Sequence, residues 1–337
     1  MHYNNFDFLR ILAAVSVLFF HTIDRLQIEV YNYIFDFFKL IPGVPIFFFI
    51  SGFLISLSYS RSTSFMNYIK KRILRIYPAL LVCLILSVLS LFIVGYLDSK
   101  IFFESKFWMW IFAQSTFVQF YNPDFLRSFG VGVLNGSLWT ISVELQFYIL
   151  IPIVYFFINK DIKKKNLYLL VLILFFSLVN LIFSNLKVGT FNEQTLIMKL
   201  MFVSFIPWFY MFLLGVLFQE NKDRLHFLIN AQWYTKLLIV SMCLLLYKLF
   251  GMNPITFVLL CIVIVILVFS FKRFSSLIFK GNDYSYGIYI YHAVIINFFV
   301  YFHLVKELKY FFFVYLLTFV FAFLSWHFIE KPFLKLK

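Results

Sequence analysis

The segment Asn4–Asp24, NNFDFLRILAAVSVLFFHTID, is apolar enough for a membrane helix, yet it contains Arg10 and His21. These residues are eleven apart, almost three helical turns, so both side chains leave the same face about 16 Å apart along the axis. An ionisable side chain in hydrocarbon costs roughly 2.5–3.5 kcal/mol on insertion scales and usually marks a functional position. We therefore expect the rest of the chain to build a cavity around this face.

Composition excludes an ordinary soluble domain. Of the 337 residues, 63% are hydrophobic and only 13% are charged, whereas a soluble domain is about 45–50% apolar. Apolar runs of about 20 residues recur along the chain, which is typical of a polytopic helical membrane protein. We predict an all-α transmembrane bundle of about ten helices, forming one membrane-embedded domain over residues 1–337, with no internal repeat.

Ten spans are predicted from these runs. They cover residues 6–23, 41–59, 77–97, 138–158, 167–184, 200–218, 237–251, 254–271, 284–302 and 310–329. The aromatic segment 107–121 is too short for a span, so it is interpreted as a re-entrant or interfacial piece.

The basic residues between the spans set the orientation. If the N-terminus is cytoplasmic, the inner connections hold 18 lysines and arginines and the outer connections hold 10, as the positive-inside rule requires. Both termini are then cytoplasmic in a multi-pass protein of the inner or plasma membrane. The net charge of +14 would suggest nucleic acid in a soluble protein. Here topology and anionic membrane lipids explain it, so no nucleic-acid partner is expected.

Cysteine usage predicts neither a disulfide framework nor a metal site. Cys83, Cys243 and Cys261 all lie inside apolar runs, without paired or metal-like spacing, so they are interpreted as small core residues. The first helix lacks a basic flank and a small-residue cleavage site, so we expect it to be retained.

An imidazole and a carboxylate are predicted at the same membrane depth. His21 lies in the outer third of an outward-running helix, and Glu144 lies about 9 Å inside the inward-running fourth span. Such a pair can act as a general base and its orienting group. Two alternatives stay open: Glu144 balances a structural cation, or Asp24, one turn from His21, orients the imidazole.

A basic cluster precedes the third span. Lys71, Arg72 and Arg75 lie at the predicted cytoplasmic mouth, and the two arginines share a helical face because they are three residues apart. Guanidinium groups suit phosphate oxygens, so the cluster is predicted to hold the phosphates of a cytosolic donor. The alternative is a positive-inside anchor.

Two further blocks combine small and polar residues. Ser51-Gly52 interrupts a bulky helix, where small residues let helices approach closely or let a ligand reach the backbone. Ser51 is not predicted to be a nucleophile, since no base lies beside it in sequence. Asn135 or Ser137 is expected to cap the fourth span, while Ser137 and Trp139 are also candidates for sugar contact.

The ninth span and the C-terminal end supply the last candidates. Tyr291 and His292 fall near mid-membrane. His292 is either a second ionisable group of the cavity or a helix-to-helix hydrogen bond. Glu330 is expected to pair with a basic residue at the mouth, and Pro332 to stop the last helix.

Taken in order, these blocks resemble the integral-membrane acyltransferase-3 family, which modifies sugars and lipids. The resemblance rests on the following stretches: Phe6–Arg10 with His21, Phe47–Ile55, Arg72–Pro78, Ser137–Glu144, Gly287–His292 and Glu330–Phe333. Each stretch alone is weak, but six in order are specific, and they extend from the first predicted helix to the tenth.

The resemblance implies an acyl-CoA donor entering from the cytoplasm and a glycan or lipid-linked sugar as acceptor, with no metal. It implies O-acyl transfer, with acetyl-CoA as the expected donor. His21 is then the general base, and Glu144 or Asp24 is its orienting group. The expected donor-binding residues are Arg10, Lys71, Arg72 and Arg75. The residues expected to contact substrate are Ser51, Ser137, Trp139, Tyr291 and His292. The alternative function is a polysaccharide transporter or flippase, although the repeated halves common in transporters are absent.

Overall fold

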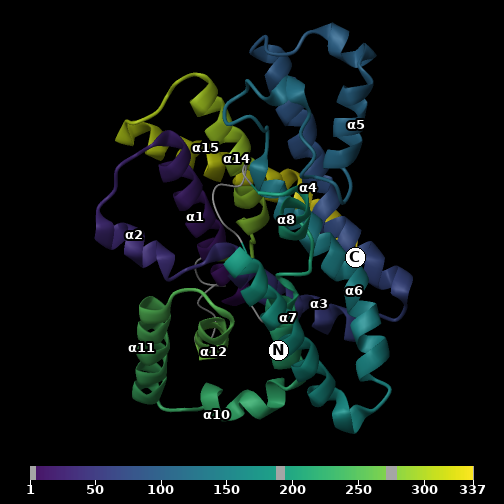
Figure 1. Cartoon of the computed structure of the whole chain (residues 1–337), viewed down its shortest axis with the longest axis vertical. Coiled ribbons are helices and arrows are strands. Elements are labelled where there is room, and N and C mark those ends of the chain that lie inside the picture. The colour runs from purple at the N-terminus through teal and green to yellow at the C-terminus, as the bar shows by residue number, and fades with distance from the viewer. Residues whose placement is uncertain (1–4, 187–193, 271–278, 337) are drawn as a thin grey trace. The chain divides into compact units, whose positions relative to one another are not determined.

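The computed structural model describes residues 5–186, 194–270 and 279–336. Within these ranges all the regular elements are helices and no strand occurs (Figure 1). This confirms the predicted all-α class.

Seven helical segments are long and apolar enough to cross a membrane. Across the described ranges they are α1 (Asn5–Leu26), α2 with α3 (Asn32–Ser60), α4 (Phe65–Ile93), η3 with α6 (Gly136–Ile158), α7 (Lys165–Leu186), α11 (Trp233–Phe250) and α15 to α16 (Leu308–Leu334). Three shorter apolar helices are α9 (Phe209–Glu220), α12 (Pro254–Ser270) and α14 (Ser285–Tyr301). Each of the ten predicted spans overlaps one of these helices, which confirms a polytopic membrane protein. The last residue of the span 254–271 lies outside the described residues.

Several boundaries differ from those predicted. Helix α4 begins at Phe65, twelve residues before the predicted span 77–97, and contains Pro78 in its interior. The polar start of α4 lowers its hydropathy, so the apolar run alone marks only the later part of the helix. Helix α9 begins at Phe209 instead of residue 200, because a short helix, α8 (Leu196–Phe202), and a turn precede it.

The aromatic segment 107–121 falls into one short helix and a turn. Helix α5 (Ser105–Gln114) is followed by a chain reversal held by the buried Gln114 amide. Its Nε2 donates to the carbonyl oxygens of Gln119 at 3.1 Å and Tyr121 at 2.9 Å. The short length agrees with the expectation that this segment is not a span.

The chain forms two compact units that interleave in sequence. Unit 1 contains residues 1–13, 39–65 and 143–282, and unit 2 contains residues 14–38, 66–142 and 283–337. The prediction of a single domain over 1–337 stays a prediction.

In unit 1, α3 (Gly43–Ser60) packs against α9 through paired glycines. A Cβ atom on Gly52 would lie 2.0 Å from the backbone oxygen of Phe212, and one on Gly215 would lie 2.1 Å from that of Phe49. Only hydrogen fits at these two positions, so the backbones approach as small residues allow in membrane proteins. This confirms the prediction that the small residues of the Ser51-Gly52 block permit close helix packing.

In unit 2, α14 is a largely buried helix. Its residues 285–297 are buried, and Gly287 lies directly against Ala322 of α15 (Leu308–Ser325). The Asn297 amide donates to the carbonyl oxygens of Val133 at 2.8 Å and Leu134 at 3.0 Å. These contacts attach α14 to α15 near its start and to the segment before α6 near its end.

The C-terminal helix continues past Pro332, contrary to expectation. After α15 the chain forms a π-helical turn, η7 (Trp326–Glu330), and then one further turn, α16 (Lys331–Leu334), with the proline in its first turn. Pro332 directly follows the π-helical turn and lies at the first or second position of α16, a place in a helical segment where proline is common.

Replacing Gly52 with alanine is expected to destabilise unit 1, because the new methyl group collides with the backbone of α9 and one helix must move away. The measurement is the thermal unfolding temperature of purified protein in detergent. Gly95→Asn is the control, since Gly95 has open space around it and a φ of +72° that asparagine accepts. Equal unfolding temperatures for Gly52→Ala and wild type would contradict the packing argument.

The predicted orientation can be tested by labelling single introduced cysteines. The three native cysteines are buried, while Asn32 and Lys163 are exposed and lie in connections assigned to opposite sides. In intact cells a membrane-impermeant maleimide is expected to label Asn32→Cys but not Lys163→Cys, and cell lysis is expected to expose the second site. The reverse pattern would invert the topology.

Candidate active site

The two histidines predicted to be functional contact one another in unit 2. Nδ1 of His21, on α1, lies 2.9 Å from Nε2 of His292, on α14. The rings are stacked, with centroids 5.1 Å apart and an interplanar angle of 26°. His292 is fully buried and His21 is half-buried. The partly exposed imidazole of His21 therefore contacts the fully buried imidazole of His292.

The hydrogen bonds around His292 assign the tautomers of both rings. Nδ1 of His292 lies 3.1 Å from the carbonyl oxygen of Ile288, and a carbonyl can only accept, so this nitrogen carries the proton. Nε2 of neutral His292 then accepts the bond from Nδ1–H of His21. Nε2 of His21 is left with a free lone pair, which is the form of a general base.

A cavity of about 680 Å³ adjoins His21 in unit 2. It is formed by the end of α1, the following connection and the start of α2 (Asn32–Lys39). Its lining residues are Phe20, His21, Ile23, Asp24, Arg25, Ile28, Val30, Asn32 and Phe35. We call it the α1–α2 cavity. Through it a small molecule can reach the imidazole of His21.

Asp24 and Glu144, the two carboxylates predicted to orient His21, bond to other side chains. Asp24 forms an exposed ion pair with Nε of Arg25 at 3.2 Å. In unit 1, Oε1 of Glu144 accepts hydrogen bonds from Ser51 Oγ at 2.9 Å and Tyr148 OH at 2.8 Å. The sequence did not reveal the Ser51–Glu144 contact, because the two residues lie 93 positions apart. The orienting contact that the structure provides for His21 comes from His292.

Arg75 is held by two buried carboxylates in unit 2. Its Nη2 lies 2.5 Å from Oδ2 of Asp283, and its Nη1 lies 3.7 Å from Oε2 of Glu330. Ser325 Oγ donates to the other oxygen of Glu330 at 3.0 Å, and Ser285 Oγ donates to Asp283 at 2.5 Å. The expected pairing of Glu330 with a basic residue is confirmed, and Arg75 is positioned by this pairing.

The other predicted donor-binding residues are half-buried cations on helices. Arg10 lies on α1, and Lys71 and Arg72 lie on α4. The Arg72 guanidinium lies over the ring of Tyr68, 6.0 Å from its centroid, a geometry in which the ring stabilises the cation. Their role in donor binding stays a prediction.

Asn135 provides the predicted cap for the start of the fourth span. Its Oδ1 accepts from the backbone N–H of Ser137 at 3.3 Å and from Ser137 Oγ at 2.7 Å. Trp139 is half-buried at the first turn of α6 (Trp139–Ile158). The buried ring of Tyr291 packs against Phe321 of α15, with centroids 5.5 Å apart. The proposed substrate contacts of Ser137, Trp139 and Tyr291 stay predictions.

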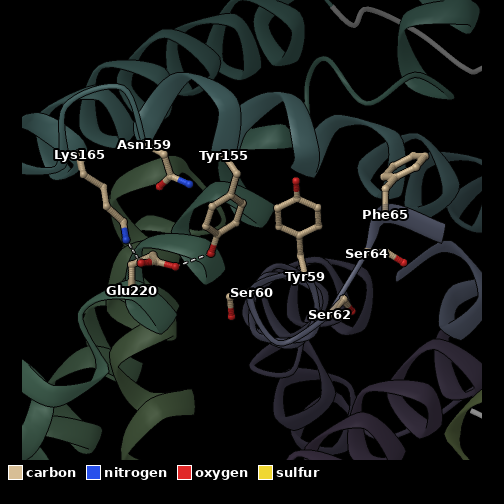
Figure 2. A pocket seen from close by; sticks show the side chains of 9 residues that line it. All are labelled: Tyr59, Ser60, Ser62, Ser64, Phe65, Tyr155, Asn159, Lys165 and Glu220. Atoms are coloured by element: carbon tan, nitrogen blue, oxygen red, sulfur yellow. Dashed lines mark hydrogen bonds and ion pairs between the residues drawn. The ribbon is translucent and has the colours of Figure 1, made fainter. Parts of the chain in front are cut away.

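Unit 1 contains a polar pocket of about 450 Å³ that sequence reasoning missed (Figure 2). Lys165 and Tyr155 both point at Glu220 and bond to its carboxylate. Ser56 Oγ lies 2.6 Å from Tyr155 OH and donates to Gln219 at 2.8 Å. These residues come from four apolar helices, α3, α6, α7 and α9, so no local pattern connects them. Within the network, the carboxylate of Glu220 neutralises the charge of the half-buried Lys165.

No group of three or more histidine, cysteine, aspartate or glutamate side chains is arranged for a metal ion within residues 5–186, 194–270 and 279–336. Cys83, Cys243 and Cys261 are buried free thiols.

The fold and the histidine pair define a polytopic membrane protein with a hydrogen-bonded imidazole pair beside an open cavity. The chain belongs to the acyltransferase-3 family, because the family model, described as an acyltransferase domain, matches residues 3–327. It is therefore a membrane acyltransferase. This confirms the resemblance seen in the sequence motifs.

Two relatives show what the chain is similar to. It is 28% identical to an O-acetyl transferase of Shigella phage Sf6 over 320 residues, which cover 88% of this chain and 87% of that protein. It is 39% identical to nodulation protein 10 of Rhizobium leguminosarum bv. viciae over 160 residues, 45% of this chain. That match spans 44% of the length of the nodulation protein. No solved structure matches the chain.

Arg75→Leu is expected to lower the thermal unfolding temperature in detergent strongly, because it leaves Asp283 and Glu330 buried without their cation. Breaking a buried ion pair from one side costs about 3–5 kcal/mol. Adding Asp283→Asn and Glu330→Gln to Arg75→Leu is expected to restore much of the stability, since the uncompensated charges are then removed. Arg72→Leu, one turn earlier on α4, is the matched control with a smaller expected loss. Equal losses for the two single variants would refute the positioning role of Arg75.

Proposed function

We propose that this acyltransferase moves an acyl group, in the simplest case acetyl, from cytoplasmic acyl-CoA to a hydroxyl group of a cell-surface polysaccharide or lipid-linked sugar. The observation that carries the proposal is the free Nε2 lone pair of His21, oriented by His292 and lining an open cavity. The name of the phage relative supports an O-linked acetyl product. The protein is proposed to act in the inner or plasma membrane.

His21 is the general base of the proposed reaction. Its Nε2 accepts the proton of the acceptor hydroxyl while that oxygen attacks the thioester carbonyl carbon. The carbon–sulfur bond then breaks, and the imidazolium returns the proton to the departing sulfur, so the products are an oxygen ester and free CoA thiol. A positioned acid–base group of this kind contributes typically about 10²–10⁴-fold to a rate.

His292 is a positioning residue in this scheme. By accepting the bond from Nδ1–H it holds the His21 ring in one tautomer and one orientation. The Ile288 carbonyl does the same for His292. In hydrolytic triads a carboxylate orients the histidine that acts as the base. In the proposed scheme the imidazole of His292 takes the place of that carboxylate.

For the donor, we retain the proposal that Arg10, Lys71 and Arg72 bind the phosphates of acyl-CoA. Guanidinium groups donate two parallel hydrogen bonds to phosphate oxygens, which lysine cannot do. Arg75 forms ion pairs with Asp283 and Glu330. We therefore propose that it does not bind phosphate itself but supports the helix that carries Lys71 and Arg72. Eleven residues of α1 separate Arg10 from His21, about 16 Å of helix, a separation that suits the extended pantetheine arm of the donor.

Transfer of labelled acetyl from acetyl-CoA to surface glycan tests the proposal. In native membranes that contain the full chain, His21→Ala is expected to reduce transfer by at least about 10²-fold. His303→Asn, a change of an exposed histidine, is the control and is expected to leave transfer unchanged. Undiminished transfer by stably inserted His21→Ala protein would end the assignment, and glycan export without any acyl product would favour a transporter.

Two substitutions of His292 separate positioning from simple packing. The amide oxygen of glutamine can occupy the place of Nε2 and accept the bond from His21, whereas leucine fills the volume without accepting. We expect His292→Gln to retain clearly more transfer than His292→Leu, with KM for acetyl-CoA unchanged in both. Equal activity of the two variants, at equal unfolding temperature, would refute the positioning role.

A further inference from the structure

We propose that the α1–α2 cavity binds the sugar portion of the acceptor, and that Asp24, Arg25, Asn32, Phe20 and Phe35 recognise it. This inference rests on the proposed function, because it needs His21 as the base. The five residues lie outside the stretches that resemble the family, and together they form a site for a neutral, hydroxyl-rich ring.

The cavity lies directly against His21. His21 is itself part of the cavity wall, so a molecule bound there lies against the side chain that must remove its proton. His21 is half-buried while His292 behind it is fully buried. Its volume of about 680 Å³ lies within the range usual for ligand sites, about 300–1,000 Å³.

The polar groups of the cavity suit sugar hydroxyls. A hydroxyl both donates and accepts, and the cavity offers a carboxylate, a guanidinium and an amide, on Asp24, Arg25 and Asn32. The Asp24–Arg25 pair is exposed, with side chains 69% and 50% accessible. Exposed ion pairs contribute only about 0–1 kcal/mol, so both groups can turn to a ligand at little cost.

An aromatic surface completes the site. The half-buried rings of Phe20 and Phe35 meet edge to face, with centroids 5.4 Å apart and an angle of 83°. The electron-rich face of an aromatic ring attracts positively polarised groups, and the C–H bonds on the flat side of a sugar ring are such groups. One apolar platform beside a few polar side chains is the usual composition of a specific small-molecule site.

The charge of the cavity argues against the donor as its occupant. The charges of Asp24 and Arg25 cancel, and among the described residues no other lysine, arginine, aspartate or glutamate lines the cavity. The phosphates of CoA need several cations, whereas a neutral glycan does not. In the predicted orientation the cavity also lies on the outer side, where surface polysaccharide is found.

Transfer assays on three substitutions test the site: Asn32→Ala, Asp24→Asn and Phe35→Ala. The full chain is produced in native membranes, which supply the glycan acceptor, and labelled acetyl-CoA is varied. We expect each substitution to reduce transfer at saturating acetyl-CoA by about fivefold or more, the equivalent of one lost hydrogen bond or ring contact. KM for acetyl-CoA is expected to stay within about twofold of wild type.

Matched controls change the same residue types outside the cavity. Glu29→Gln alters an acidic residue of the same connection, and Phe37→Ala alters an exposed phenylalanine of α2; neither residue lines the cavity. Both are expected to transfer acetyl at the wild-type rate. Unfolding temperatures in detergent are measured for all five variants, so a loss of transfer is compared at equal stability.

A protection assay provides an independent readout. In Asn32→Cys protein, oligosaccharides released from the surface polysaccharide of the producing cell are expected to slow labelling of the cysteine by a charged maleimide. Acetyl-CoA is expected to leave the labelling rate unchanged. Protection by acetyl-CoA instead of the oligosaccharide would make this a donor site and overturn the inference.

The outcomes distinguish this inference from the proposed function. If His21→Ala abolishes transfer while the three cavity variants retain it, the sugar binds elsewhere and the base assignment stands. If His21→Ala retains transfer, the proposed function fails first. A loss in the cavity variants that vanishes when phosphatidylglycerol is added to the membranes would identify a lipid site and overturn the inference.

Discussion

The hydrogen bond between His21 and His292 is the interaction on which the site depends. Two imidazoles inside apolar helices cannot remain without partners, since an unpaired polar group in an apolar environment costs several kcal/mol. Each ring therefore satisfies a nitrogen of the other, and the backbone of Ile288 satisfies one more. The arrangement couples the position of α1 to that of α14, so the orientation of the His21 ring follows from the packing of two helices and not from a flexible loop.

The same requirement for paired polar groups positions α14 along its length. At its start, Asp283 accepts from Ser285 and holds Arg75. Near its middle the Ile290 carbonyl accepts from Asn135 at 2.8 Å, and toward its end Asn297 donates to the segment before η3. Three polar attachments along one buried helix leave it little freedom to rotate. His292 lies between the second and third, which explains how a fully buried imidazole can serve as a rigid support.

Sequence reasoning predicted the helices and the family motifs, because hydropathy and spacing are local properties. It did not find which faces meet. His292 was a candidate for two roles, but its partner His21 lies 271 residues away. The hydrogen bond to Nδ1 of His21 comes from His292 and not from Asp24 or Glu144. The network of Tyr155, Lys165 and Glu220 was missed for the same reason, since each residue alone looks like the end of an apolar helix. Long-range pairing is decided by packing, which a single sequence does not display.

The π-helical turn at residues 326–330 has a consequence for insertions and deletions. Ser325 Oγ donates to Glu330, five residues later, and in an ordinary α-helix side chains five apart diverge by about 140°. The wider turn adds one residue to the helical repeat and so changes its phase. Removing one residue from this turn would rotate the acid off the guanidinium of Arg75, even if each remaining side chain kept its identity. At residues 326–330 the number of residues is therefore constrained more tightly than their identity.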